Sequence, residues 1–167
     1  ATKDRTRAQP YLDRVYREMV MQGGLFDDDR PVEQLHWGGG TPTFISHDEM
    51  RELMRVTGEH FTLCDDDSGE YSIEIDPRSV NFEKIRTLRA VGFNRMSVGV
   101  QDFDPVVQKA VNRTQSREQT RDVIETARDI GFRSINIDLM YGVPGQTERS
   151  LQQCLRTTLA LEPSHIS

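Results

Sequence analysis

The fold of this chain is organised around the stretch Leu35-His36-Trp37-Gly38-Gly39-Gly40-Thr41-Pro42. A short apolar run, typical of a strand, reaches three successive glycines, and the Thr-Pro that follows cannot continue the strand. Three glycines suit a ligand that lies directly against the main chain, or a backbone with positive φ. Bare N–H and C=O groups at a strand end also form a small polar cradle for a charged small molecule. A tight turn between a strand and a helix explains the same residues, so both interpretations stay open.

The composition limits the class of protein. The 167 residues are enough for one domain with its own core. Acidic residues number 27 against 21 basic ones, no basic run is present, and aromatic residues make up only 7%, which argues against nucleic acid as the main partner. No apolar run approaches a membrane span and no signal peptide is visible, so we expect a cytoplasmic protein. The polar start without an initiator Met predicts that the chain is a segment of a longer protein.

Two features that resemble metal sites have simpler explanations. Cys64 and Cys154 lie far apart and fit no metal-ligand spacing, so we expect two reduced thiols. The acidic stretch 65–69 has the wrong spacing for an EF-hand and no bidentate Glu at the right distance, so we expect a plain acidic turn.

Helical and strand patterns alternate along the chain. Apolar residues at helical spacing predict helices over 10–22, 46–61, 82–91, 104–111, 116–130 and 148–161. The spacing of Ser46 and Glu49, and that of Ser116 and Gln119, predicts a capping box at the start of two of these helices. Strands are predicted from about Gln34 into the glycines and over 70–76, 95–101, 134–141 and the start of 163–167. The alternation predicts a parallel sheet with right-handed crossovers, which fits part of a βα barrel or a stretch of a doubly wound sheet.

The two faces of three predicted strands differ in polarity. Each strand has one apolar face, and the opposite faces carry Ser72, Glu74 and Asp76; Arg95, Ser97, Gly99 and Gln101; and Ser134, Asn136 and Asp138. A doubly wound sheet is apolar on both faces, whereas these strands are apolar on one. We therefore predict an α/β barrel segment with parallel strands, helices outside and a polar lumen, with a ligand site toward the C-terminal ends of the strands.

That architecture places one set of polar groups around a single cavity: Gly38, Gly39, Gly40, Glu74, Asp76, Gln101 and Asp138. Three carboxylates in a cavity need partners, because a buried unpaired charge is costly. A ligand ammonium, ribose hydroxyls or nearby arginines would all serve. For any single carboxylate, internal pairing with Arg95 or Arg113 is an equal alternative. Because the three carboxylates lie at matching positions along the barrel axis, the set as a whole favours a ligand.

Five motifs, in order along nearly the whole chain, resemble those of a known family. They are His36–Thr43, Glu74–Arg78, Gly92–Phe103, Val111–Gln115 and Asn136–Thr147. As a set they are similar to the oxygen-independent coproporphyrinogen III oxidases, which are radical S-adenosylmethionine (SAM) enzymes of haem biosynthesis.

A sister group, the haem-chaperone-like radical SAM proteins, shares only part of this pattern. It has the glycine run and the Asp-Leu-x-Tyr-Gly stretch, but differs at three other places. There this chain has Asp76 before Pro77, Gln101-Asp102-Phe103, and Asn112-Arg113-Thr114-Gln115. On all three points the chain sides with the oxidases.

The resemblance implies a partial, TIM-barrel-like (βα) barrel in which two SAM molecules bind. Carried over position by position, Gly39 and Glu74 match contacts to the first SAM, and contacts to the second are matched by Gly40, Thr41, Gln101, Arg113 and Asp138. The strand faces point to Glu74, Gln101 and Asp138 independently. Arg113 rests on the resemblance alone, although an arginine suits a SAM carboxylate. No catalytic residue is assigned.

The implied activity is an oxidoreductase reaction. Reductive cleavage of SAM at a 4Fe–4S cluster gives an adenosyl radical, which takes a hydrogen from a propionate of coproporphyrinogen III. Loss of CO2 then leaves a vinyl group, and the final product is protoporphyrinogen IX. An electron donor such as a flavodoxin-type reductant, and a monomeric protein, are implied as well. Two alternatives remain: a haem-chaperone-like protein that binds haem without decarboxylating, and an interaction domain that has lost its cluster.

One departure from the family matters. The family holds its cluster with three cysteines in a C-x3-C-x2-C loop after the first strand, and neither cysteine of this chain can serve, so no metal ligand is expected here. We expect residues 1–167 to be a single incomplete core domain, with that loop upstream and a C-terminal domain downstream. The segment alone should be inactive and should expose a sheet edge at each end. His36 lies near the site, and we predict a structural role for it.

Overall fold

The computed structural model describes residues 4–27 and 29–167. Residues 1–3, which the predicted domain includes, and Asp28 lie outside the described residues. The main sheet has the strand order β2-β4-β5-β6-β7, and all its pairs are parallel. Its strands are β2 (Gln34–Trp37), β4 (Glu70–Ile75), β5 (Arg95–Gln101), β6 (Ser134–Leu139) and β7 (His165–Ile166). The parallel βα architecture predicted from the sequence is confirmed.

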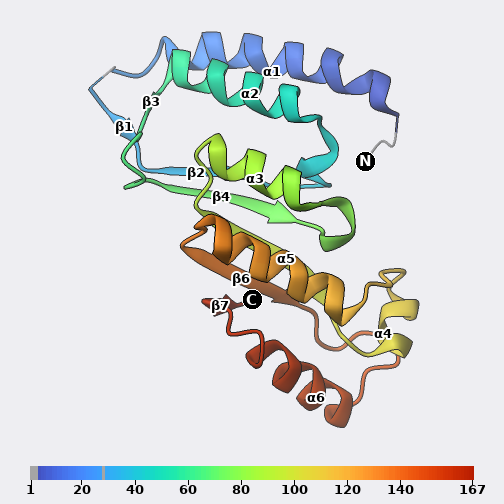
Figure 1. Ribbon diagram of the computed structural model, residues 1–167. Helices are drawn as coiled ribbons and strands as arrows, with labels where there is room; N and C mark the ends of the chain where they lie inside the picture. The colour runs from blue at the N-terminus through green and yellow to red at the C-terminus, as the bar shows by residue number, and fades with distance from the viewer. Residues whose placement is uncertain (1–3, 28) are drawn as a thin grey trace.

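In the described part of the chain, six α-helices alternate with these strands (Figure 1). They are α1 (Ala8–Gly23), α2 (His47–His60), α3 (Phe82–Ala90), α4 (Pro105–Ala110), α5 (Arg117–Ile130) and α6 (Glu148–Leu159). All six were predicted, with ends that differ by at most two residues. In Figure 1, α1 and α6 lie at opposite ends of the molecule, with α2, α3 and α5 in succession between them.

Several small elements were not predicted. Two two-residue strands, β1 (Pro31–Val32) and β3 (Thr62–Leu63), pair in a separate parallel sheet. Three 3-10 turns, η1 (Arg5–Arg7), η2 (Pro42–Phe44) and η3 (Pro77–Ser79), lie next to longer elements. Strand β6 ends at Leu139, two residues before its predicted end, and the Met140 N–H that follows donates to the Gln101 carbonyl at 2.8 Å.

Local sequence signals explain where the helices begin. At α2 the predicted capping box is complete: Ser46 Oγ accepts from the Glu49 N–H at 3.2 Å, and Glu49 Oε2 accepts from the Ser46 N–H at 2.6 Å. At α5, in the described structure, Ser116 caps the Gln119 N–H at 3.0 Å and the reciprocal half of the box does not form. Helix α5 ends as predicted at Gly131, whose φ of +97° favours glycine.

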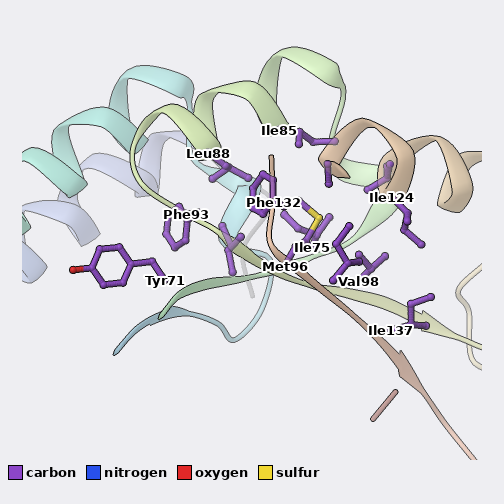
Figure 2. Close-up of a cluster of buried hydrophobic side chains, with 14 of the residues drawn as sticks. Tyr71, Ile75, Ile85, Leu88, Phe93, Met96, Val98, Ile124, Phe132 and Ile137 are labelled. Atoms are coloured by element: carbon purple, nitrogen blue, oxygen red, sulfur yellow. The ribbon is translucent and has the colours of Figure 1, made fainter. Parts of the chain in front are cut away.

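The predicted division of each strand into two faces is confirmed. The apolar residues of β4, β5 and β6 are buried beneath α3 and α5, where they meet Ile85, Leu88 and Ile124 (Figure 2). The polar residues of the same strands lie on the opposite face and most are half-buried. Burying one such aliphatic side chain stabilises the fold by about 1.5–3 kcal/mol, so the helices are held to a single face of the sheet. The other face is left for the site, as in a barrel and unlike a doubly wound sheet.

The sheet is open at both edges in the described part of the chain. Strand β2 pairs only with β4, and β7 pairs only with β6. The exposed edges expected from the sequence are therefore present in the structure. No helix among the described residues is both long and apolar enough to cross a membrane.

Cys64 and Cys154 are both free thiols, as predicted. Cys154 is buried on α6, and this burial raises the pKa of its thiol to about 11. Cys64 is half-buried.

We expect the two thiols to react with Ellman's reagent at very different rates at about pH 8, because only the thiolate of an accessible cysteine attacks. Cys64 should react first, and Cys154 should react only as fast as the fold opens. Substituting Cys64→Ser should remove the fast phase and leave the slow one, while in denaturant both thiols should react together. Rapid labelling of Cys154 in the native Cys64→Ser variant would contradict this burial.

Candidate functional site

The glycine run lies directly after β2, and each of its three positions favours glycine for a structural reason. A Cβ added at Gly38 would lie 2.4 Å from His36 Nε2 and 2.9 Å from Glu74 Oε1, so a side chain there would displace both groups. Gly39 and Gly40 have φ values of +76° and +40°, which other residues rarely adopt. The Gly39 N–H donates to Glu74 Oε2 at 3.0 Å. The run is therefore both a turn and a point of close approach to neighbouring polar groups.

A cavity of about 250 Å³ lies at the C-terminal ends of β4 and β5 beside this run. Its lining includes six of the seven predicted binding residues: Gly40, Thr41, Glu74, Gln101, Arg113 and Asp138. The seventh, Gly39, is joined to the cavity by its hydrogen bond to Glu74. The structure therefore brings together residues that lie up to about a hundred positions apart in the sequence.

Asp76, the third carboxylate predicted at the cavity, is paired within the protein. Its Oδ2 lies 2.7 Å from Arg78 Nη2 and 3.7 Å from Arg113 Nη2. Burial works against the ionised form, but the hydrogen bonds from Arg78 and the charges of both arginines outweigh it and hold the pKa of Asp76 below its ordinary value. Internal pairing with Arg113, one of the two sequence-based alternatives, holds for this residue. Arg95 pairs instead with Glu70.

Glu74 and Asp138 have a different environment. Glu74 accepts the Gly39 N–H, and His36 Nε2 lies 3.5 Å from its Oε1. Asp138 accepts hydrogen bonds from Ser97 Oγ and Asn136 Nδ2, both at 2.8 Å. Within the described residues, neither carboxylate forms a salt bridge with a lysine or an arginine. Both therefore line the cavity with a negative charge that a bound ligand would complement.

His36 contacts two polar groups of the neighbouring strand. Its Nδ1 lies 2.7 Å from Ser72 Oγ, while its Nε2 faces Glu74. The ring thus supports the Glu74 carboxylate, an arrangement compatible with the structural role that we predicted for it.

Arg113 is held over the backbone of β5. Its Nη2 donates to the Gly99 carbonyl at 3.1 Å, and a Cβ at Gly99 would lie only 2.7 Å from that nitrogen. The chain delivers Arg113 through Asn112, which has a φ of +53°. In the described structure the Arg113 Nε is buried and has no hydrogen-bond partner. Such a donor is costly unless an acceptor is supplied, so Arg113 retains capacity for an anionic group.

Gln101 reaches the cavity through an irregular turn. The register between β5 and β6 shifts so that Gly99 pairs with Asp138 and Gln101 pairs with Leu139, which marks a β-bulge. The Asp102 N–H donates to the Val100 carbonyl at 3.0 Å across Gln101, whose φ is +71°. This is a γ-turn of positive φ, a rare and strained form. Regular alternation correctly predicted that Gln101 lies at the cavity, but did not predict this backbone.

Two polar side chains of the cavity wall were missed from the sequence. Ser97 shares the polar face of β5 with Gln101, so the period-two alternation already contained the signal that could have selected it. Arg78 lies beyond the end of β4 in η3, where no periodic pattern applies. Among the residues that the structure describes, no group of three or more His, Cys, Asp or Glu is arranged to hold a metal ion.

The chain matches known proteins over almost its whole length. A family model described as the radical SAM superfamily matches residues 4–158. The oxygen-independent coproporphyrinogen III oxidase of Pseudomonas aeruginosa is 51% identical over 166 residues, which are 99% of this chain and 36% of that protein. The protein of the same name from Escherichia coli is 44% identical, with the same two shares. This chain therefore spans little more than a third of the length of the curated relatives it matches.

Solved structures resemble it as well. The coproporphyrinogen III oxidase from Escherichia coli, described as a radical SAM enzyme, superposes with a TM-score of 0.91 at 43% identity, covering 99% of this chain and 38% of that one. A radical SAM methyltransferase from Kitasatospora setae has a TM-score of 0.65 at 16% identity and covers 93% of this chain and 29% of its own, which is a likeness of fold alone.

The lowered pKa of Asp76 predicts that part of the free energy of unfolding is lost in acid. The ionised carboxylate stabilises the fold fully above its unfolded pKa of about 3.9, and this stabilisation is lost as the pH falls through the lower native pKa. The free energy of unfolding, measured with urea between about pH 6 and 2.5, should therefore fall less steeply at the acid end in Asp76→Asn. Arg78→Ala should flatten the profile in the same way, and slopes unchanged in both variants would contradict the pairing.

The positive φ of Gln101 predicts that the alanine variant at this position is less stable than the glycine variant, which reverses the usual order. Gln101→Gly should have a free energy of unfolding about 1 kcal/mol higher than Gln101→Ala, because glycine relieves the strained backbone and alanine does not. At Ser97, in the regular part of the same strand, the order should be the usual one, with alanine the more stable. Equal or greater stability of Gln101→Ala in urea unfolding would argue against strain at this position.

Proposed function

Since this chain belongs to the radical SAM superfamily, we propose that it is the SAM-binding core of an oxygen-independent coproporphyrinogen III oxidase. The substrate of the whole protein is then coproporphyrinogen III, and the reaction is the oxidative decarboxylation of its propionates to vinyl groups. The observation that carries the proposal is the cavity in which six separately predicted residues meet. Identity of 51% to an oxidase over nearly the entire chain supports it.

The residues of the cavity fit the chemical groups of SAM. An amino-acid carboxylate would supply the acceptor that the buried Arg113 Nε lacks. Glu74 and Asp138 would accept hydrogen bonds from ribose hydroxyls or pair with an ammonium group. The glycine run leaves the main chain of Gly40 and Thr41 accessible to a ligand. Cation and anion sites thus lie in one cavity, as a zwitterionic cofactor requires.

A second and larger cavity, of about 900 Å³, borders the same glycines. Its wall includes Trp37, Gly39 and Lys84, and burial together with the charge of Arg5 lowers the pKa of Lys84. Two cavities that border one glycine run support the proposal that two SAM molecules bind. Gly39 borders the larger cavity and donates to Glu74 in the wall of the smaller one, so the pair assigned to the first SAM stands between the two cavities, and the remaining residues serve the second.

The residues described here do not fit the cluster. Neither Cys64 nor Cys154 lines either cavity beside the glycine run. We propose that the cluster ligands lie in the part of the protein outside this stretch, so residues 1–167 form one incomplete core domain and are inactive alone. SAM at a reduced 4Fe–4S cluster supplies radical chemistry, while the chain's own residues hold and orient the cofactor. A flavodoxin-type electron donor, a monomeric state and a cytoplasmic location belong to the same proposal.

Calorimetric binding of SAM to this chain tests the proposed site. Glu74→Ala and Asp138→Ala should each weaken the affinity at least about tenfold, because each removes a group worth roughly 1.5–3 kcal/mol as a charged hydrogen-bond acceptor. Asp129→Ala, at an exposed position of α5, is the matched control and should bind as the unaltered chain does. SAM binding that neither site variant weakens would exclude this cavity.

Product analysis tests the activity. With its cluster reconstituted and with SAM and a reductant added, the full-length protein should convert coproporphyrinogen III to protoporphyrinogen IX and CO2, with SAM consumed as the oxidant. Recovery of unreacted substrate by a preparation that binds SAM and contains the cluster would overturn the oxidase proposal. Tight haem binding by that preparation would instead favour the haem-chaperone-like alternative.

A further inference from the structure

The strained turn at Gln101 is held by the residue that follows it. Asp102 is completely buried, and its polar atoms are occupied by neighbours. Its Oδ1 accepts the Asp104 N–H at 2.8 Å, its Oδ2 accepts Gln146 Nε2 at 2.7 Å, and its backbone carbonyl accepts Gln108 Nε2 at 2.9 Å. A backbone conformation that costs roughly 1–3 kcal/mol persists only where its surroundings over-determine it, and Asp102 provides that restraint.

Gln146 connects this restraint to the loop that follows β6. Its Nε2 also donates to the Met140 carbonyl at 2.9 Å, and its Oε1 accepts the Gly142 N–H at 2.8 Å. One side-chain amide therefore closes the loop over residues 140–146 and attaches it to Asp102. The Met140 N–H in turn donates to the Gln101 carbonyl at 2.8 Å. The contacts form a closed ring that contains the peptide group between Gln101 and Asp102.

The chemistry of Asp102 and Gln146 suits hydrogen bonds of fixed direction. The Asp102 carboxylate is an acceptor only, and the neighbours around it are donors: a backbone N–H, the Gln146 amide and the Cys154 thiol. An asparagine at this position would turn an N–H group toward one of those donors. Within the described residues Asp102 forms no salt bridge with a lysine or an arginine, so its charge is balanced by hydrogen bonds whose directions are fixed.

We infer that Asp102 and Gln146 are positioning residues: as a clamp they hold the γ-turn that places Gln101 at the cavity. Neither residue lines the cavity, so the clamp acts through Gln101 and contacts no ligand itself. The identity of the ligand as SAM rests on the function proposed above, whereas the clamp and its effect on the turn do not. The clamp also joins the loop after β6 to the site at β5, so that a change in this loop alters the position of Gln101.

The first test needs no ligand and uses the full-length protein. Gln146→Ala should accelerate amide hydrogen exchange at least about tenfold in peptides that contain the Asp102 and Met140 amides, because their hydrogen bonds border the turn. Exchange in β4 and α5 should stay as in the unaltered protein, which shows that the variant folds. Gln152→Ala removes an exposed glutamine of α6 whose side chain donates to Glu148 in the described structure, and serves as the matched control. Unchanged exchange at both amides in Gln146→Ala would overturn the clamp.

The second test separates positioning from a direct role in binding. By calorimetry, Gln146→Ala should weaken SAM affinity by about the same factor as Gln101→Ala, and the double variant should bind no more weakly than Gln101→Ala alone. The exchanged pair Asp102→Asn with Gln146→Glu keeps one hydrogen bond with donor and acceptor reversed, so it should recover part of the affinity lost in Asp102→Asn. Fully additive losses in the double variant would show that Gln146 does not act through Gln101.

The two tests distinguish the inference from the function on which its second half rests. A protein that binds no SAM but shows faster exchange in Gln146→Ala would count against the proposed function and for the clamp. A protein that binds SAM with equal affinity in Gln146→Ala and in the unaltered form would leave the function standing and overturn the positioning role.

Discussion

Unequal faces on parallel strands are the constraint on which the rest of this structure depends. Each of β4, β5 and β6 buries one row of side chains beneath helices and turns the other row away. Because the apolar row alone can release free energy by burial, the helices gather on that face. The polar row then collects at the ends of adjacent strands, and a charged cavity follows from the packing of the opposite face.

Within that cavity the carboxylates divide into two kinds. Asp76 is paired with arginines and so stabilises the wall, whereas Glu74 and Asp138 contact neutral donors and a histidine and are left to interact with a ligand. Arg113 has the complementary property, with one buried nitrogen lacking a partner in the described structure. The site therefore has acceptors for a positively charged group and a donor for a negatively charged one, and these do not all pair with one another. This supports binding of a molecule that carries both charges.

Several departures from ideal backbone geometry border the same cavity. Gly39, Gly40, Gln101 and Asn112 all have positive φ, and Gly38 and Gly99 leave room for neighbouring polar side chains. Local rules of chain conformation are expected to fail where function requires it, provided that the surroundings compensate. Here the compensation is visible in the hydrogen bonds of Asp102 and Gln146, which come from a strand end and from a separate loop.

The sequence by itself determined the order of helices and strands, the polarity of each strand face and most of the cavity wall. Those features follow from local periodicity, capping residues and short motifs, which depend on neighbours a few positions away. Only the tertiary structure decided that Asp76 pairs with Arg78 and Arg113, that Gln101 lies in a strained turn, and that Gln146 reaches Asp102. The reason is physical: the geometry of contacts between residues far apart in sequence is set by how the strands register, and no local pattern carries that information.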